Sequence, residues 1–281
     1  RHPAETLSNM QAAQRFMDSQ KEKSGVVFGT GRPSDGYKLV DGTAVDSVTE
    51  IIGKFKDSSG LIAWAHKLGK EGKDHRAEME AAGRWGSAVH TALESLVRNN
   101  SAIAEPGLQT AAEAARLAFQ KPSVKHCLDG LTHVEVPLVH SELKYGGTFD
   151  FIADGIISDW KTSNDVYIDY VIQMGAYYEL CLHNGMDVKA ARIISIKKAG
   201  DSPNYYGTGE VIITNIGPEM LKQARLTFLH LLNAHNLIGS MKTKLKEAKS
   251  EARKTAKSDS PPKPRAKRPS GWVTSAVRKP T

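Results

Sequence analysis

The segment spanning residues 146–161 carries the strongest local folding signal in the chain. Its Asp154-Gly155 pair separates two runs rich in β-branched and aromatic residues. Such a pair between apolar runs is typical of a two-residue type I′ turn, so we expect a β-hairpin here. Counting outward from the turn gives the expected cross-strand pairs, which are Ala153 with Ile156, Ile152 with Ile157, Phe151 with Ser158, and Asp150 with Asp159.

The last of these pairs opposes two carboxylates. Like charges opposed across two strands are destabilising, so Asp150 and Asp159 together indicate a cation between them. Lys161 lies two residues after Asp159 and therefore projects from the same face of its strand. An acid-x-Lys triplet occurs five times in the chain, and we interpret the four outside the hairpin as surface charge. The opposite face is expected to pack into the core through Phe149, Phe151, Ile156 and Trp160.

Two helices are expected beside this hairpin. One runs from about residue 165 to residue 183, where an Asn-Gly pair ends it, and its Gln173 and Tyr177 share one face. The other covers residues 78–98, with His90 at the edge of an apolar stripe. On these patterns alone, the histidine fits either a core residue or a metal ligand, and the Gln-Tyr pair fits either packing or a site.

In series, these motifs resemble the RecB-type branch of the PD-(D/E)XK nucleases. The motifs that carry the resemblance are Gly86-x-x-x-His90, Gly147-Thr148-Phe149-Asp150, Asp159-Trp160-Lys161 and Gln173-x-x-x-Tyr177. Two further stretches add to the resemblance. The N-terminal region of phage and mitochondrial members is similar to Ser47-Val48-Thr49-Glu50-Ile51-Ile52 with Leu61-x-x-Trp64. The strand before the catalytic hairpin is similar to Glu135-Val136-Pro137-Leu138. The resemblance spans residues 45–200, and its Asp-x-Lys form is a variation that this branch uses in place of Glu-x-Lys.

The resemblance implies a restriction-endonuclease-like α/β fold, a central mixed β-sheet flanked by helices. It implies that Mg²⁺ or Mn²⁺ is coordinated by His90, Asp150, Asp159 and the backbone carbonyl of Trp160. Hard divalent cations prefer oxygen ligands, and an imidazole ligand makes Mn²⁺ more acceptable than an all-oxygen site does. The implied catalytic residues are Asp150, Asp159, Lys161, Gln173 and Tyr177. Within this set the lysine would orient or activate the attacking water, and the Gln-Tyr pair would position the substrate strand or the lysine.

The rest of the pattern fits the same α/β class. Strands are expected over residues 132–139, 191–197 and 205–213, where they join the hairpin in a mixed sheet. Further helices are expected over residues 107–121 and 218–249.

Charge divides the chain into unequal parts. Residues 242–281 hold 13 of the 38 Lys and Arg but only 3 of the 31 Asp and Glu, so the preceding residues are slightly acidic although the whole chain carries +7. We expect residues 1–44 to form a partly flexible arm, residues 45–241 the nuclease domain, and residues 242–281 a basic, proline-containing, largely disordered tail.

Three interpretations of this tail stay open. The first is a tether that binds DNA phosphates without sequence preference through Lys263, Arg265, Lys267 and Arg268. The second is a solubilising appendage. The third is a docking peptide for a protein partner, centred on Trp272-Val273.

Several classes of protein are disfavoured by the sequence. The two cysteines, Cys127 and Cys181, can form neither a disulfide framework nor a four-cysteine iron–sulfur cluster. No apolar run is long enough for a membrane span, no signal-peptide pattern opens the chain, and no phosphate-loop signature indicates an ATPase. We therefore expect a cytoplasmic protein of a bacterium or phage-infected cell, with no membrane partner and with the mitochondrial matrix as the alternative location.

The function expected from the resemblance is metal-dependent hydrolysis of DNA. We expect an exonuclease acting on linear ends or single strands in phage or bacterial replication, recombination or DNA turnover. One alternative is a catalytically inactive DNA-binding or packaging-associated protein on a nuclease fold. The others are an endonuclease and a ribonuclease of the same fold.

Overall fold

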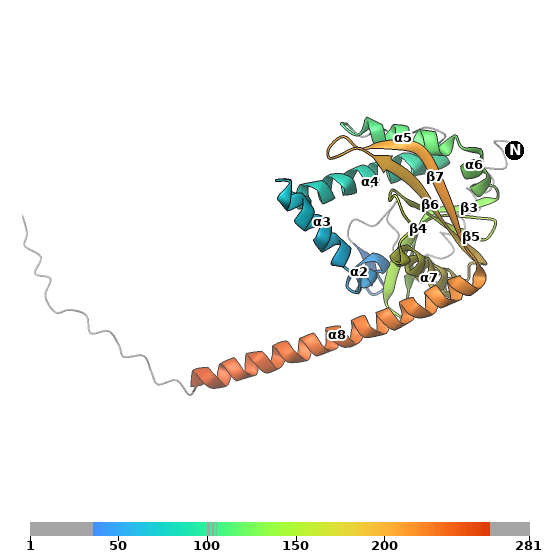
Figure 1. The fold of residues 1–281 in the computed structure, drawn as a ribbon. Helices are drawn as coiled ribbons and strands as arrows, with labels where there is room; N and C mark the ends of the chain where they lie inside the picture. Colours follow the sequence, from blue (N-terminus) through green and yellow to red (C-terminus); the bar gives the residue numbers. More distant parts are fainter. Residues whose placement is uncertain (1–35, 100–101, 103, 105, 259–281) are drawn as a thin grey trace, which may run out of the picture. The chain divides into compact units, whose positions relative to one another are not determined.

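The chain forms a mixed α/β structure in which helices flank a central β-sheet, as the sequence predicts (Figure 1). The structure is a computed structural model that describes residues 36–99, 102, 104 and 106–258. The elements in chain order are β1 (Tyr37–Lys38), β2 (Ala44–Ser47), α2 (Val48–Gly53), α3 (Ser59–Lys70), α4 (His75–Asn99), α5 (Gln109–Phe119), α6 (Pro122–Cys127), β3 (Leu131–His140), β4 (Tyr145–Ala153), β5 (Ile156–Lys161), α7 (Ile168–His183), β6 (Ala190–Ala199), β7 (Tyr206–Ile216) and α8 (Pro218–Ser258). Most of the predicted arm and the four basic tail residues, Lys263, Arg265, Lys267 and Arg268, lie outside the described residues.

The sheet is mixed because it combines hairpins with crossover connections. Its strand order is β1-β2-β4-β5-β6-β7, and β3 pairs with β4 off this path. The strands pair antiparallel in the β3–β4, β4–β5 and β6–β7 pairs and parallel in the β2–β4 and β5–β6 pairs. Parallel strands need a crossover, and α7 supplies it between β5 and β6.

The central hairpin has the turn and the register that the sequence predicts. Asp154 and Gly155 both have positive φ, at 49° and 71°, as the two central residues of a type I′ turn require. The register contains three of the four predicted pairs, Ala153 with Ile156, Ile152 with Ile157 and Phe151 with Ser158, and the fourth, Asp150 with Asp159, is not among the paired residues. The turn therefore fixes which side chains of β4 and β5 face each other near the candidate site.

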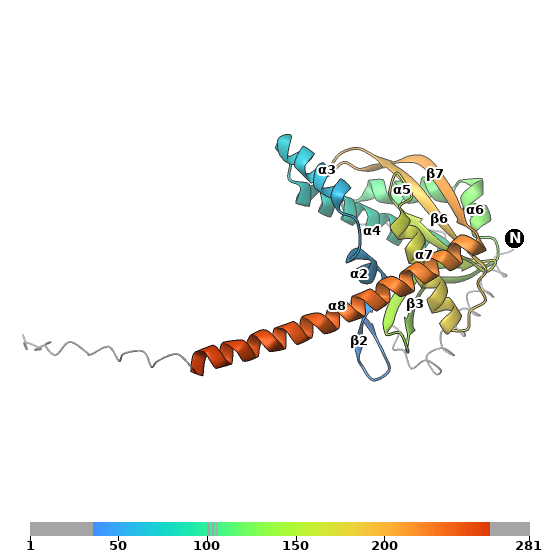
Figure 2. The same ribbon diagram turned by 60° about the horizontal axis from the view of Figure 1, so that its bottom comes forward.

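The helices cover the sheet from both sides and produce two hydrophobic clusters. One cluster combines α2, α7 and the first part of α8 with the sheet, and the other combines α4, α5 and α6 with it. Figure 1 shows α4 and α5 on one side of the sheet and α7 on the other, and the turned view in Figure 2 agrees.

The prediction that one face of the hairpin packs into a single core is wrong in part. Phe151 and Trp160 pack together in the second cluster, with ring centroids 5.2 Å apart, but Phe149 packs in the first. The break in alternation coincides with Glu135 on β3, which lies between the partners of Phe149 and Phe151 and has φ of 49°. Strand residues normally have negative φ, and the alternation rule assumes this regular backbone. A local distortion at Glu135 therefore cannot be predicted from the sequence pattern.

Helix α2 begins with a capping box, which explains the Ser-Val-Thr-Glu stretch. The N–H of Glu50 donates to Ser47 Oγ at 3.2 Å, and the N–H of Ser47 donates to Glu50 Oε2 at 2.7 Å. Two N–H groups that the helix itself cannot pair are thus satisfied at its start. The cap lets α2 follow directly from β2, which pairs with β4 through Asp46 and Ser47.

Helix α8 is longer than the expected 218–249. The compact unit of the structure includes it as far as His235, and Asn236 begins a second unit. The first part packs through Leu221, Phe228 and Leu232, and its Arg225 forms an ion pair with Glu179 of α7. No helix within the described ranges has the length and apolar character needed to cross a membrane.

The backbones of α7 and α8 meet at Gly175. A Cβ built there would lie 2.3 Å from the backbone of Ala224 and Arg225, closer than atoms can approach. We predict that Gly175→Ala lowers the free energy of unfolding by about 1–3 kcal/mol, because the two helices must separate. Urea unfolding followed by circular dichroism measures this change.

The matched control is Gly83→Ala on the exposed side of α4, where an added Cβ meets nothing within 4 Å. Removing a glycine from an open helical position should stabilise the protein by roughly 0.5–1 kcal/mol. Equal effects of the two substitutions would contradict the close approach of α7 and α8.

Candidate active site

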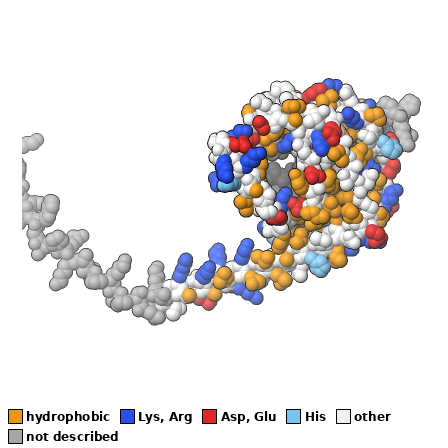
Figure 3. All heavy atoms as spheres, viewed as in Figure 1, with side chains coloured by type: hydrophobic (Ala, Val, Ile, Leu, Met, Phe, Trp, Pro, Cys, Tyr) orange, Lys and Arg blue, Asp and Glu red, His pale blue; other side chains and the backbone are white. Residues whose placement is uncertain are grey.

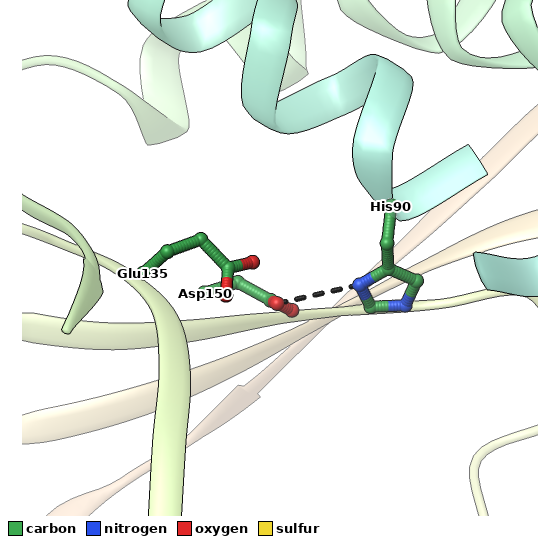
Figure 4. Close-up of side chains that lie close together, drawn as sticks. All are labelled: His90, Glu135 and Asp150. Atoms are coloured by element: carbon green, nitrogen blue, oxygen red, sulfur yellow. Dashed lines mark hydrogen bonds and ion pairs between the residues drawn. The ribbon is translucent and has the colours of Figure 1, made fainter. Parts of the chain in front are cut away.

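Three ligand-type side chains converge from three elements of the compact unit. His90 comes from α4, Glu135 from β3 and Asp150 from β4 (Figure 4). One potential ligand atom from each lies within 4.8 Å of the other two. His90 Nδ1 lies 3.3 Å from Asp150 Oδ1. The sequence predicts His90 and Asp150 as ligands, and the structure brings these two together.

Glu135 is a site residue that the sequence reasoning missed. Val134 pairs with Phe151 and Val136 with Phe149, so Glu135 lies opposite Asp150 between them. Its side chain is buried, and its positive φ is a strained conformation of the kind that clusters at functional sites. The available signal was a lone acid in an apolar strand, but using it requires the pairing of β3 with β4.

Asp159 and Lys161 lie at the end of β5 and form an ion pair. Burial raises the pKa of the Asp159 carboxyl, the nearby ammonium of Lys161 opposes that shift, and the charge of Asp150 adds to it. The charge of His90 also acts on this pKa, so Asp159 lies within electrostatic reach of the other group. Asp159 itself stands outside the group of His90, Glu135 and Asp150, whereas the sequence predicts it as a ligand.

Trp160 orients Asp150. Its backbone N–H donates to Asp150 Oδ2 at 2.6 Å, at the point where the sequence predicts Asp150 opposite Asp159. This bond occupies one carboxylate oxygen and directs the other, Oδ1, toward His90. The side chain of Trp160 is buried against Phe151, so the residue anchors the strand end.

Gln173 and Tyr177 form the pair that helical spacing predicts. Gln173 Nε2 donates to the Tyr177 hydroxyl at 2.7 Å, and both residues are buried. Burial raises the pKa of Tyr177 well above its usual value, and the charges of Asp159 and Asp150 raise it further. Tyr177 therefore keeps its proton and can donate it to an acceptor in the site.

Gly147 explains how Tyr177 comes so near the strand. A Cβ at this glycine would lie 2.8 Å from Tyr177 Cε1 and 3.0 Å from Val48 Cγ2. Gly86 has a similar role one helical turn before His90, since a Cβ there would lie 2.8 Å from Thr162 Oγ1. The two motif glycines thus permit close approach of α7 and α4 to the ends of β4 and β5.

The charge balance of the site favours a bound cation. Glu135, Asp150 and Asp159 are all buried, and the positive groups that contact them include Lys161 and, when protonated, His90. Neighbouring buried carboxylates repel each other, and positive charge placed between them lowers this repulsion. An imidazole nitrogen with carboxylate oxygens is a donor set that fits a divalent cation such as Mg²⁺ or Mn²⁺.

Comparisons with known proteins give distant similarities only. No protein-family model matches the chain, and no curated protein matches its sequence. Similar solved structures include a candidate exonuclease from Eubacterium rectale, with a TM-score of 0.36 and 14% identity over 55% of this chain and 68% of that chain. A phage-related exonuclease from Haemophilus somnus has a TM-score of 0.28 and 18% identity over 55% of this chain and 82% of that chain.

A third similar structure is LHK-Exo in complex with dAMP. Its TM-score is 0.29 and its identity 15%, over 57% of this chain and 93% of that chain. At TM-scores this low, the similarities assign neither a family nor an activity to this chain.

We predict that Glu135→Gln weakens Mn²⁺ binding by at least about tenfold, because it removes a charged ligand oxygen while keeping the side-chain volume. Isothermal titration calorimetry measures the affinity. Thermal stability without metal should stay the same or rise, since the substitution relieves repulsion between buried carboxylates.

Glu210→Gln on β7 is the matched control, because its carboxylate is largely exposed and pairs only loosely with Lys197 at 3.8 Å. Unchanged Mn²⁺ affinity in Glu135→Gln would remove Glu135 from the site.

Proposed function

We propose that the chain is a divalent-metal-dependent nuclease that hydrolyses phosphodiester bonds of DNA. The observation that carries the proposal is the group of half-buried His90 with buried Glu135 and Asp150, beside the ion pair of Asp159 and Lys161. Metal ligands beside a lysine offer two of the groups that can promote in-line attack of water on a phosphate, namely a cation to polarise the phosphate and an ammonium to orient the water. The resemblance to RecB-type nucleases, carried by the same residues, supports this function.

A divalent cation held by His90, Glu135 and Asp150 would polarise the scissile phosphate and lower the pKa of a coordinated water. Asp159 would hold Lys161 in position through their ion pair. The ammonium of Lys161 would orient the attacking water and offset negative charge that develops on the phosphate. The site therefore separates ligand residues from the residue that positions the nucleophile.

Tyr177 and Gln173 would act as positioning residues. Because the hydroxyl oxygen of Tyr177 accepts from Gln173, its proton is directed elsewhere, toward the carboxylates that raise its pKa or toward a substrate oxygen. The backbone carbonyl of Trp160 would be an additional ligand, because the hydrogen bond from the Trp160 N–H to Asp150 holds this residue beside the metal group.

We further propose exonuclease action on linear ends or single strands, in phage or bacterial replication, recombination or DNA turnover, because the phage members that the chain resembles mostly process ends. Positive charge that would favour binding of DNA lies near the end of α3, where Lys67 and Lys70 occupy the last turn and Figure 3 shows Lys and Arg side chains gathered. Such a patch attracts the phosphate backbone without reading its sequence. The cytoplasm of a bacterium or infected host is the proposed location.

The decisive activity test uses end-labelled linear duplex, single-stranded and closed circular DNA with Mg²⁺ or Mn²⁺. We predict metal-dependent loss of the linear substrates with circles spared, and a fall of at least about 100-fold in Asp159→Ala/Lys161→Ala, since positioned charge of this kind contributes roughly that much.

The control is Asp187→Ala/Lys189→Ala, the same Asp-x-Lys triplet on the exposed surface before β6. It should cleave like the parent protein. Cut circles would reassign the chain as an endonuclease, and intact DNA in every reaction with binding retained would leave a DNA-binding protein on this fold.

The basic tail is proposed to bind DNA phosphates. Replacing Lys263, Arg265, Lys267 and Arg268 together by Gln should weaken duplex binding and flatten the dependence of log Kd on log salt. The slope should fall by about 0.9 for each phosphate that the tail no longer neutralises. Fluorescence anisotropy between low and moderate salt measures the slope, and an unchanged slope would contradict the tether.

A further inference from the structure

An exposed aromatic residue stands beside the candidate active site with no role in the metal group. Tyr167 caps the start of α7 and is 49% exposed, and its neighbour Ile168 is 69% exposed. Two adjacent large apolar side chains exposed to water next to a charged site indicate a binding surface more strongly than single scattered ones do.

Ring contacts connect Tyr167 to the lysine of the site. Lys161 Nζ lies over the ring of Tyr170, 5.0 Å from its centroid. The rings of Tyr170 and Tyr167 meet edge to face, with centroids 5.5 Å apart. A tyrosine in edge contact with a neighbouring ring is held in a defined orientation at little entropic cost. Tyr167 thus lies one ring beyond the residue that contacts Lys161.

A second lysine fixes the other side of Tyr167. Lys56, from the segment after α2, places its Nζ 5.8 Å from the Tyr167 centroid and 3.1 Å from Asp169 Oδ2. Asp169 lies in the first turn of α7, so this ion pair ties the α2 end to the same helix start. Two ammonium groups therefore flank a pair of tyrosine rings whose outer member is half exposed.

We infer that Tyr167 is a stacking platform for an unpaired nucleobase of the strand whose phosphate is bound at Lys161. Exposed aromatic rings beside lysines are the elements with which proteins hold single-stranded nucleic acid, the bases on the rings and the phosphates on the cations. The inference rests on the proposed function and deepens it. Both faces of an internal base in a duplex are covered by neighbouring base pairs, so such a base cannot lie flat on Tyr167, and the platform favours a single strand or a strand end.

Ile168, the next residue along the chain, is also exposed and adds apolar surface at the start of α7. The ring of Tyr167 and the aliphatic side chain of Ile168 offer a base apolar surface and a single hydroxyl. Preference among the four bases should therefore be small.

The test measures stacking without cleavage. A short single-stranded oligodeoxynucleotide carrying 2-aminopurine near its end is titrated in EDTA, where a metal-dependent nuclease is inactive, with the parent protein and with Tyr167→Phe, Tyr167→Leu and Tyr167→Ala. Stacking on an aromatic ring quenches 2-aminopurine fluorescence. Met220→Ala on α8, another exposed large apolar residue, is the control.

The parent, Tyr167→Phe and the control should quench the fluorescence and bind with similar Kd. Tyr167→Leu and Tyr167→Ala should lose the quenching and bind roughly tenfold more weakly, a result that apolar coverage alone would not give for leucine. Thermal melting of each variant identifies any loss of folding, and Tyr167→Phe keeps the ring if the shorter side chains unfold the helix start. Unchanged quenching in Tyr167→Ala, or no binding of the oligonucleotide by the parent, overturns the inference.

The outcome is separable from the proposed nuclease activity. Quenching that depends on Tyr167, combined with no cleavage in Mn²⁺, would reject the nuclease and keep the platform. Cleavage in Mn²⁺ with full quenching in Tyr167→Ala would keep the nuclease and reject the platform.

Discussion

The structure depends on the burial of three carboxylates in one small region. Glu135, Asp150 and Asp159 are each at most 5% exposed, and three ionised acids placed this way repel one another. A folded chain tolerates this arrangement when protons or a cation compensate the charge, because uncompensated buried charges cost several kcal/mol each. Burial raises the pKa of Asp159 and the charge of Asp150 adds to that shift, and a divalent cation would relieve the repulsion between the carboxylates.

A short turn, a backbone hydrogen bond and two glycines position these groups. The Asp154-Gly155 turn fixes the register of β4 against β5, and the Trp160 N–H then fixes the rotamer of Asp150. Close approach of the flanking helices depends on Gly86 and Gly147, whose missing Cβ atoms leave room for Thr162 and Tyr177. The acidic group is thus held by rigid strands and packed helices, which keeps ligand geometry constant.

Local pattern predicted much of this arrangement. The Asp-Gly turn, its register and the Gln173–Tyr177 contact depend on short-range geometry, so periodicity and turn chemistry were sufficient for them. The place of Glu135 in the group could not be predicted from local pattern, because it depends on the pairing of β3 with β4. It also depends on a backbone conformation that no residue preference indicates. The alternation rule failed between Phe149 and Phe151 at the same distortion, so both errors have one physical origin.

The central claim is that His90, Glu135 and Asp150 hold a divalent cation. Crystals of the protein soaked in Mn²⁺ and measured at a wavelength where manganese scatters anomalously test it most directly. The account predicts an anomalous peak within ligand distance of His90 Nδ1 and the carboxylates of Glu135 and Asp150. A fully occupied peak elsewhere in the molecule, or no peak at a saturating Mn²⁺ concentration, would contradict it.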